Sequence, residues 1–75
     1  MRAYILIEAT IGKARDVAAK MKQVPQVKQC YLVTGPYDVI AVVEGADANA
    51  VGNAVTGHVH AIPGVARTVT CLAVL

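Results

Sequence analysis

The stretch RAYILIEA, residues 2–9, is apolar on both faces and rich in strand-forming side chains. Successive side chains of a strand point to opposite faces. Ile5 and Ile7 therefore lie on one side of the predicted strand, and Tyr4 and Leu6 lie on the other. Two apolar faces are typical of a strand that is covered on both sides. Residues 2–9 thus predict a central strand of a sheet.

A helical period replaces the strand period after this stretch. From Lys13 to Val24, apolar residues recur every three or four positions on one face, and most of the other positions are charged or polar. Pro25 disfavours helical backbone in the residue before it, so the predicted helix ends at Val24. The inward positions of this helix are Ala14, Val17, Ala18, Met21 and Val24.

The rest of the chain predicts four more elements and repeats the helix-to-strand join at low resolution. Residues 27–34 and 37–44 favour two strands connected by a glycine–proline turn. Asp47 is a good N-cap for a second helix, and a Pro-Gly pair separates that helix from a final strand over residues 65–75. The inward positions of the second helix are Val51, Ala54, Val55 and either His58 or Val59.

The resulting order, β-α-β-β-α-β, predicts an α+β fold of the ferredoxin-like type, built from two right-handed βαβ units. We expect a single domain over residues 1–75, with an antiparallel sheet of order 4-1-3-2 and both helices on one face. The other face carries Tyr4, Leu6, Ile40 and Val42. Apolar patches of this kind mark interaction sites, so we expect copies of the chain to associate through this face.

The length and composition of the chain also favour association of its copies. The chain has 75 residues, of which 56% are hydrophobic and only 16% are charged. A single core in so small a domain rarely supplies more than about 3–5 kcal/mol, which favours association. High hydropathy excludes disorder. The longest uncharged stretch, residues 48–66, holds Asn, His, Gly and Pro, so no membrane span and no membrane partner are expected.

The charge distribution argues against a nucleic-acid-binding surface, and the amino-terminal residues argue against a signal peptide. The net charge is only +2 and the basic residues are scattered, so the dense basic stripe of a nucleic-acid-binding surface is missing. Glu8 falls where a signal peptide keeps its apolar centre, and no Lys/Arg-rich lead precedes it. A cytoplasmic location is therefore expected.

Catalytic and metal chemistry find little support, so we expect neither an enzyme nor a cofactor. The chain contains no Ser, no glycine-rich phosphate loop and no convergent group of carboxylates. His58 and His60 diverge on a helix and lack further ligands, so no metal site is predicted. Cys30 and Cys71 fall on opposite sheet edges, about 14 Å apart. A disulfide needs Cα atoms within about 7 Å, so two buried free thiols are expected.

The polar segment Thr34-Gly35-Pro36-Tyr37-Asp38 leaves two interpretations open. It is either a structural turn, in which Tyr37 packs and Asp38 accepts backbone N–H groups, or a small-ligand site. In the second case, backbone donors near Gly35, a phenol and a carboxylate suited to an ammonium group would form the site.

The run VTGPYDV (residues 33–39) resembles the V-T-G-x-Y-D-hydrophobic hairpin of the leucine-responsive regulatory protein/AsnC (Lrp/AsnC) family, in its effector-binding domain, also called the RAM domain. VPQV (residues 24–27) resembles the family's entry to the second strand. IPGVARTVT (residues 62–70) resembles its hydrophobic-P-G-V-x-x-T-x-T run. Together the three matches extend over nearly the whole chain.

This resemblance implies a homodimer formed through the open sheet face, octameric or decameric rings of dimers, and a small effector, usually an amino acid, bound between dimers. Pro36 fills the hairpin's variable position and removes an N–H that a ligand carboxylate could have used. Carried over position by position, the ligand-binding residues would be Thr34, Gly35, Pro36, Tyr37, Asp38, Thr68 and Thr70.

One departure from the family affects the expected partners. Full-length members carry an amino-terminal helix-turn-helix domain, whereas this chain starts at the first strand. It resembles the stand-alone members, so we expect no direct DNA binding and an effect exerted through the effector or through mixed assembly with a full-length Lrp/AsnC-type regulator. Two alternatives are a cofactor-free monooxygenase of the dimeric α+β-barrel type, in which His58 would face a cavity, and a purely structural assembly partner.

Overall fold

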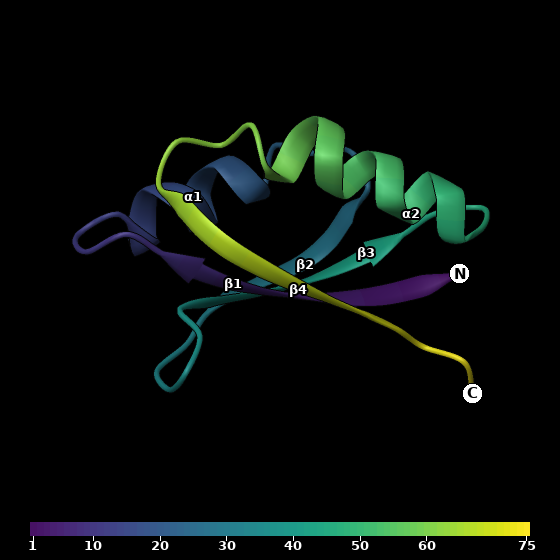
Figure 1. The fold of residues 1–75 in the computed structure, drawn as a ribbon, viewed down its shortest axis with the longest axis horizontal. Coiled ribbons are helices and arrows are strands. Elements are labelled where there is room, and N and C mark those ends of the chain that lie inside the picture. The colour runs from purple at the N-terminus through teal and green to yellow at the C-terminus, as the bar shows by residue number, and fades with distance from the viewer.

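The computed structural model describes residues 1–75 and confirms the predicted order of elements. The sheet order is β2-β3-β1-β4 with antiparallel neighbours, as predicted, and the helices cover one face of the sheet (Figure 1). The elements are β1 (Arg2–Ala9), α1 (Ala14–Met21), β2 (Val27–Leu32), β3 (Val39–Glu44), α2 (Ala48–Ala54), the π-helix η1 (Val55–Val59) and β4 (Val65–Leu72).

Three elements end earlier than predicted. After Met21 the N–H groups of Gln23 and Val24 donate to carbonyls three residues back, which tightens the chain and closes α1 before Val24. β2 stops at Leu32, where its pairing with β3 stops. β4 ends at Leu72 because its partner β1 begins at Arg2 and offers no further pairing.

The second helix is capped as predicted but continues differently. The Asp47 carboxylate accepts the N–H of Ala50 at 2.8 Å, which satisfies one of the free donors of the first turn. Past Ala54 the helix widens into η1, whose last turn is closed by the His60 N–H donating to the Val55 carbonyl, five residues back, at 2.9 Å. Of the two candidate inward positions, Val59 is buried and His58 is exposed.

The core lies between the helices and the sheet and contains only apolar residues. Ile5 and Ile7 are fully buried in it, as the strand pattern predicts. Small side chains dominate this core, so the helices pack close to the sheet. The core residues are Ala3, Ile5, Ile7, Val17, Ala18, Met21, Val39, Ala41, Val43, Val51, Ala54, Val55, Val59 and Ile62.

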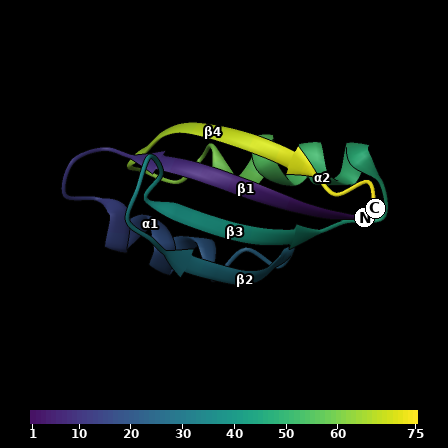
Figure 2. The ribbon, with the colours of Figure 1, turned by 90° about the horizontal axis from the view of Figure 1, so that it is seen from below.

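The opposite side of the sheet, seen in Figure 2, carries no helix and is called the open face here. The strand register places Tyr4 beside Val42 and Leu6 between Ile40 and Val69. The predicted second apolar face is therefore present in the chain. Its side chains, which share a side by their register, are Tyr4, Leu6, Gln29, Tyr31, Ile40, Val42, Val69 and Cys71.

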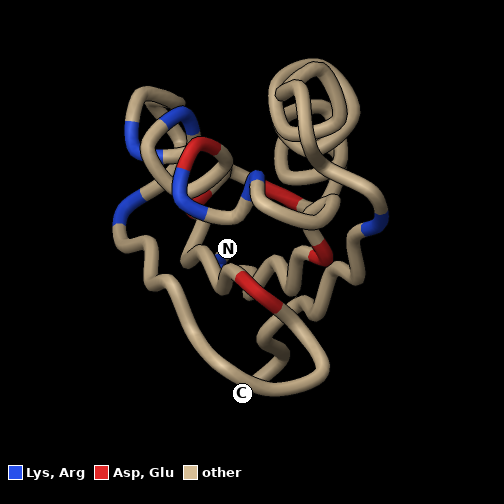
Figure 3. The backbone as a smooth tube through the Cα atoms, turned by 90° about the vertical axis from the view of Figure 1, so that its left-hand side faces the viewer, with Lys and Arg blue, Asp and Glu red and all other residues tan.

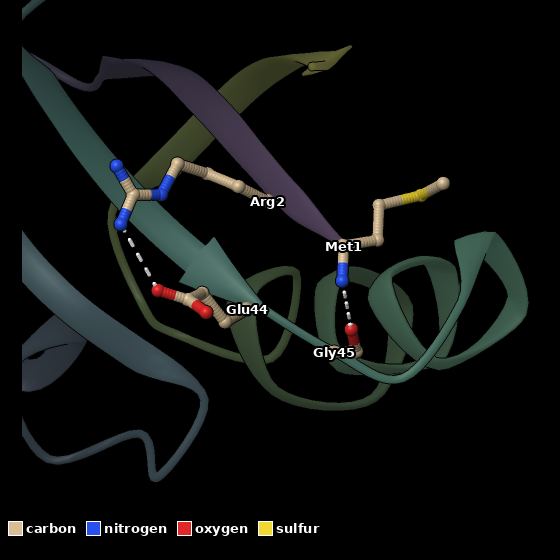
Figure 4. Close-up of polar contacts among 4 residues, drawn as sticks. All are labelled: Met1, Arg2, Glu44 and Gly45. Atoms are coloured by element: carbon tan, nitrogen blue, oxygen red, sulfur yellow. Dashed lines mark hydrogen bonds and ion pairs between the residues drawn. The ribbon is translucent and has the colours of Figure 1, made fainter. Parts of the chain in front are cut away.

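Ion pairs lie at the two ends of the open face. Arg2 and Glu44 approach to 3.2 Å beside the Met1 amino group, which donates to the Gly45 carbonyl at 2.6 Å (Figure 4). The hydrogen bond to Glu44 raises the pKa of Arg2. Arg67 and Glu8 form the second pair, at 3.2 Å. Charged pairs thus bound an apolar centre.

The basic residues gather mainly on and beside α1 (Figure 3). Neither α1 nor the longer α2–η1 segment is both long and apolar enough to cross a membrane.

A glycine fixes the approach of β4 to α1. Gly64 has φ +97°, and a Cβ atom at this position would lie 2.8 Å from the Lys13 Cβ. The Gly64 carbonyl accepts the N–H of Thr10 at 2.8 Å. The backbone therefore comes closer to the start of α1 than a residue with a side chain would allow.

Candidate functional site

The β2–β3 connection, residues 33–38, leaves the sheet on the side away from the helices (Figure 1). Gly35 has φ +146°, a conformation that residues with side chains rarely adopt, so glycine permits this turn. The Val33 N–H donates to the Asp38 carbonyl at 2.8 Å and closes the hairpin at its base. Its exposed tip is formed by Thr34, Gly35 and Pro36.

Asp38 is anchored to the end of β1. Its Oδ2 accepts the N–H of Ala9 at 2.8 Å, and its own N–H donates to the Ile7 carbonyl at 2.9 Å. This is the structural role that the first interpretation of the hairpin gave to Asp38. A carboxylate has two acceptor oxygens, and Ala9 engages only one of them, so the anchored Asp38 keeps capacity for a second donor.

Tyr37 and Thr34 have different surroundings. Tyr37 is half-buried. Thr34 is exposed and lines a hollow of about 420 Å³ at the end of β2, between this strand and the start of α1. Tyr37 and Asp38 are not part of its lining, which consists of Gly12, Ala14, Arg15, Leu32, Val33 and Thr34.

Thr68 and Thr70 lie on β4. Their register partners on β1 are Ile7 and Ile5, so both side chains stand on the helix side of the sheet. The Thr68 Oγ1 lies 2.9 Å from the His60 Nε2. A second hollow, of about 340 Å³, lies at this edge of the sheet and is lined by His60, Val65, Ala66, Arg67 and Thr68.

A single chain therefore does not unite the predicted ligand-binding residues. β1 separates β3 from β4, and two strand spacings amount to about 10 Å. The hairpin also projects on the open side, whereas Thr68 and Thr70 stand on the helix side. The seven residues form two groups, one at the hairpin and one on β4.

Sequence analysis missed two residues beside these groups. Arg15 shares the hollow of Thr34, and His60 contacts Thr68. Arg15 carries only the signal of a charged residue on the outer face of an amphipathic helix. The contact of His60 depends on η1, which the apolar period did not reveal.

The two cysteines occupy different environments. The Cys30 Sγ lies 3.8 Å from the Ala18 carbonyl in the helix layer. Burial raises the pKa of the Cys30 thiol, against an opposing effect of Lys22. Cys30 is half-buried and Cys71 is exposed on the open face, so the prediction of two buried thiols is met only in part by Cys30 and is wrong for Cys71. β2 and β4 are opposite edges of the sheet, as predicted, and both thiols are free.

The cavity expected for a monooxygenase-like enzyme is not formed between the sheet and the helices. The apolar core fills that space. His58 points away from it and is exposed. His58 therefore does not face a cavity, which was the feature that the enzyme alternative required.

Known proteins resemble this chain along its length. Residues 2–74 match the family described as the Lrp/AsnC ligand binding domain. The HTH-type transcriptional regulator FL11 of Pyrococcus horikoshii is 29% identical over 72 residues, which are 96% of this chain and 47% of the regulator. TTHA0845 from Thermus thermophilus superposes with a TM-score of 0.93 at 34% identity, over 99% of this chain and 92% of that one.

A third relative shares the fold at lower identity. The transcriptional regulator NMB0573 from Neisseria meningitidis, solved as an L-Met complex, gives a TM-score of 0.86 at 24% identity, over 99% of this chain and 49% of that one.

The chain belongs to the Lrp/AsnC ligand binding domain family, which confirms the resemblance found in its three motifs. Its ferredoxin-like fold is the fold of these relatives. The chain spans about half the length of the curated relatives that it matches.

Proposed function

We propose that this chain is an effector-binding and oligomerisation module, which binds an amino acid at a site formed between copies and thereby modulates transcription regulators of the Lrp/AsnC type. Thr34, Gly35, Pro36, Tyr37 and Asp38 supply one wall of this site, and Thr68 and Thr70 supply another. Mixed assembly with a full-length regulator is the proposed route to DNA, and octameric or decameric rings are the proposed assembly.

The observation that carries the proposal is the open face, an apolar sheet surface beside a hairpin that projects past it. On this face, Tyr4 and Tyr31 remain 39% and 51% exposed in the chain. Covering such area is the main favourable term in protein association. A second copy offers the same apolar centre bounded by the same ion pairs, which suits a two-fold dimer.

The split of the predicted site supports a location between subunits. One chain leaves about 10 Å between the hairpin strand and β4, and the two groups stand on different sides of the sheet. A neighbouring copy can bring its own β4 against a hairpin. A ligand held there favours the assembly that forms the site, by its differential affinity for that assembly. The L-Met complex of the Neisseria regulator supports an amino acid as the ligand.

Size-exclusion chromatography with light scattering, with and without a panel of amino acids, tests the proposal. We expect a dimer or larger species at micromolar concentration, and a change of subunit number or thermal stability with at least one amino acid. A monomer that no amino acid alters would contradict the proposal.

Two matched threonine variants test the site itself. Thr70→Val removes an exposed hydroxyl of the predicted site, and Thr56→Val removes a hydroxyl that donates to the Gly52 carbonyl on α2. Isothermal titration with L-methionine should show weaker binding by about 0.5–1.5 kcal/mol for Thr70→Val. Thr56→Val should leave the affinity unchanged. Equal affinities for both variants would remove Thr70 from the site.

A further inference from the structure

The contact between His60 and Thr68 connects the predicted effector site to a residue without an assigned role. The imidazole Nε2 and the hydroxyl Oγ1 are 2.9 Å apart, and both side chains line the hollow of about 340 Å³ beside β4. Thr68 belongs to the wall that β4 contributes to the proposed site. His60 therefore contacts this wall directly.

The local backbone explains why His60 reaches Thr68. The His60 N–H donates to the Val55 carbonyl, so the last turn of η1 contains one residue more than an α-helical turn. An extra residue changes the direction in which the next side chain leaves the helix. π-Turns of this kind are rare and occur often at functional sites. The turn places the imidazole over β4.

We infer that His60 is a positioning residue of the effector site, where it sets whether the Thr68 hydroxyl accepts a hydrogen bond from the ligand or donates one to a ligand carboxylate. This inference rests on the proposed function.

The chemistry follows from the atoms of the pair. A threonine hydroxyl has one hydrogen and two lone pairs. The switch requires the neutral tautomer with its proton on Nδ1, in which Nε2 accepts the Thr68 hydrogen and only lone pairs of Thr68 face a ligand. Imidazolium donates at both nitrogens, so Thr68 accepts from His60 and its hydrogen becomes available to a carboxylate. Histidine side chains change charge between about pH 5 and 8, so the affinity for a carboxylate should rise on acidification.

Other charged groups around His60 do not supply the same switch. His58 is exposed on the same helix and makes no contact with Thr68. Arg67 on β4 lines the hollow and pairs with Glu8 of β1. Lys13, Asp16 and Lys20 line a separate hollow of about 330 Å³ beside Pro63.

The test is isothermal titration of the full chain at pH 5.5 and 7.5 with L-methionine and with L-methioninol, which lacks the carboxylate. Both probes keep a charged ammonium group in this range. Wild-type protein should bind L-methionine about fivefold to tenfold more tightly at pH 5.5, the difference between a charge-assisted and a neutral hydrogen bond. L-Methioninol should show no such gain.

Variants separate His60 from its neighbours. His60→Gln keeps hydrogen-bonding atoms without titrating, so its affinity for L-methionine should not change with pH, and Thr68→Val should behave likewise. His58→Gln is the matched control and should keep the wild-type pH dependence. If His60→Gln does not fold, nuclear magnetic resonance of the wild-type rings replaces it. Saturating L-methionine should then shift the His60 signals and leave those of His58 in place.

The outcomes distinguish this inference from the proposed function. Wild-type protein that binds no amino acid overturns both. The role of His60 is overturned if wild type and His60→Gln bind L-methionine with the same pH dependence, or if the ligand does not shift the His60 signals. Either result leaves the proposed function standing.

Discussion

The helix-covered face and the open face of the sheet carry similar apolar side chains but differ in what covers them. Ile5 and Ile7 are fully buried beneath the helices, whereas Tyr4 on the same strand is 39% exposed. Alternation along β1 and β3 produces two apolar faces, and two short helices cover one of them. One strand pattern therefore specifies both the fold and the proposed association surface.

Truncation on each face should separate the two roles most strongly. Ile5→Ala removes a fully buried side chain, and we expect a loss of about 2–5 kcal/mol in the free energy of unfolding. Urea unfolding should show this loss at every protein concentration. Leu6→Ala, on the open face, should cost less at low concentration and more as the dimer forms. Equal, concentration-independent losses would contradict the proposed dimer.

A charge on the open face should dissociate the assembly and leave the fold intact. Leu6→Asp places a carboxylate in the proposed interface, where burying an ion costs several kcal/mol. Light scattering should report a monomer, and circular dichroism should be unchanged. Leu32→Asp is the matched control, because Leu32 is 43% exposed on the helix side and should leave the subunit number as in wild type. Monomers from both variants would locate the interface elsewhere.

Loss of the Asp38 carboxylate should loosen the edge of the open face where the hairpin begins. Asp38→Ala leaves the Ala9 N–H without its partner, which we expect to cost about 1–3 kcal/mol of folding free energy. Asp38→Asn keeps an acceptor oxygen and should cost less. Thermal unfolding measures both, with exposed Asp16→Ala as the control. A wild-type melting temperature for Asp38→Ala would make ligand binding its sole role.

Thiol labelling gives the mildest comparison of the two faces. The thiolate is the reactive form, and burial raises the pKa of Cys30 and so lowers its thiolate fraction at any given pH. In a monomeric variant such as Leu6→Asp, exposed Cys71 should react faster with a disulfide reagent than Cys30. In the assembled wild type Cys71 should be protected. Fast labelling of Cys71 in the wild type would show that this part of the face stays open.

Much of the fold could be predicted from the sequence, because its determinants are local. The strand period of residues 2–9, the Asp47 cap and the order of elements lead directly to the observed sheet. Element ends were less predictable, since a strand such as β4 stops where its partner β1 has no more residues to pair with. That limit lies more than sixty positions away along the chain.

The site was only partly predictable, for a related reason. The hairpin motif identified Tyr37 and Asp38 by their order, yet the bond from Ala9 to Asp38 joins residues 29 positions apart. The contact of His60 depends on one extra residue in a helical turn. Neither feature alters the apolar period, so hydrophobic patterning alone could not find them.

The absence of a side chain at Gly64 determines how closely two segments of the chain approach each other. Because its backbone occupies the space that a Cβ atom would need against Lys13, the entry to β4 and the beginning of α1 are held at a separation that only a missing methyl group permits. Even an alanine here would wedge these two segments apart. It would shift Thr68 and Thr70 on β4 relative to α1, so the alignment of the proposed ligand wall depends on the absence of this one Cβ atom.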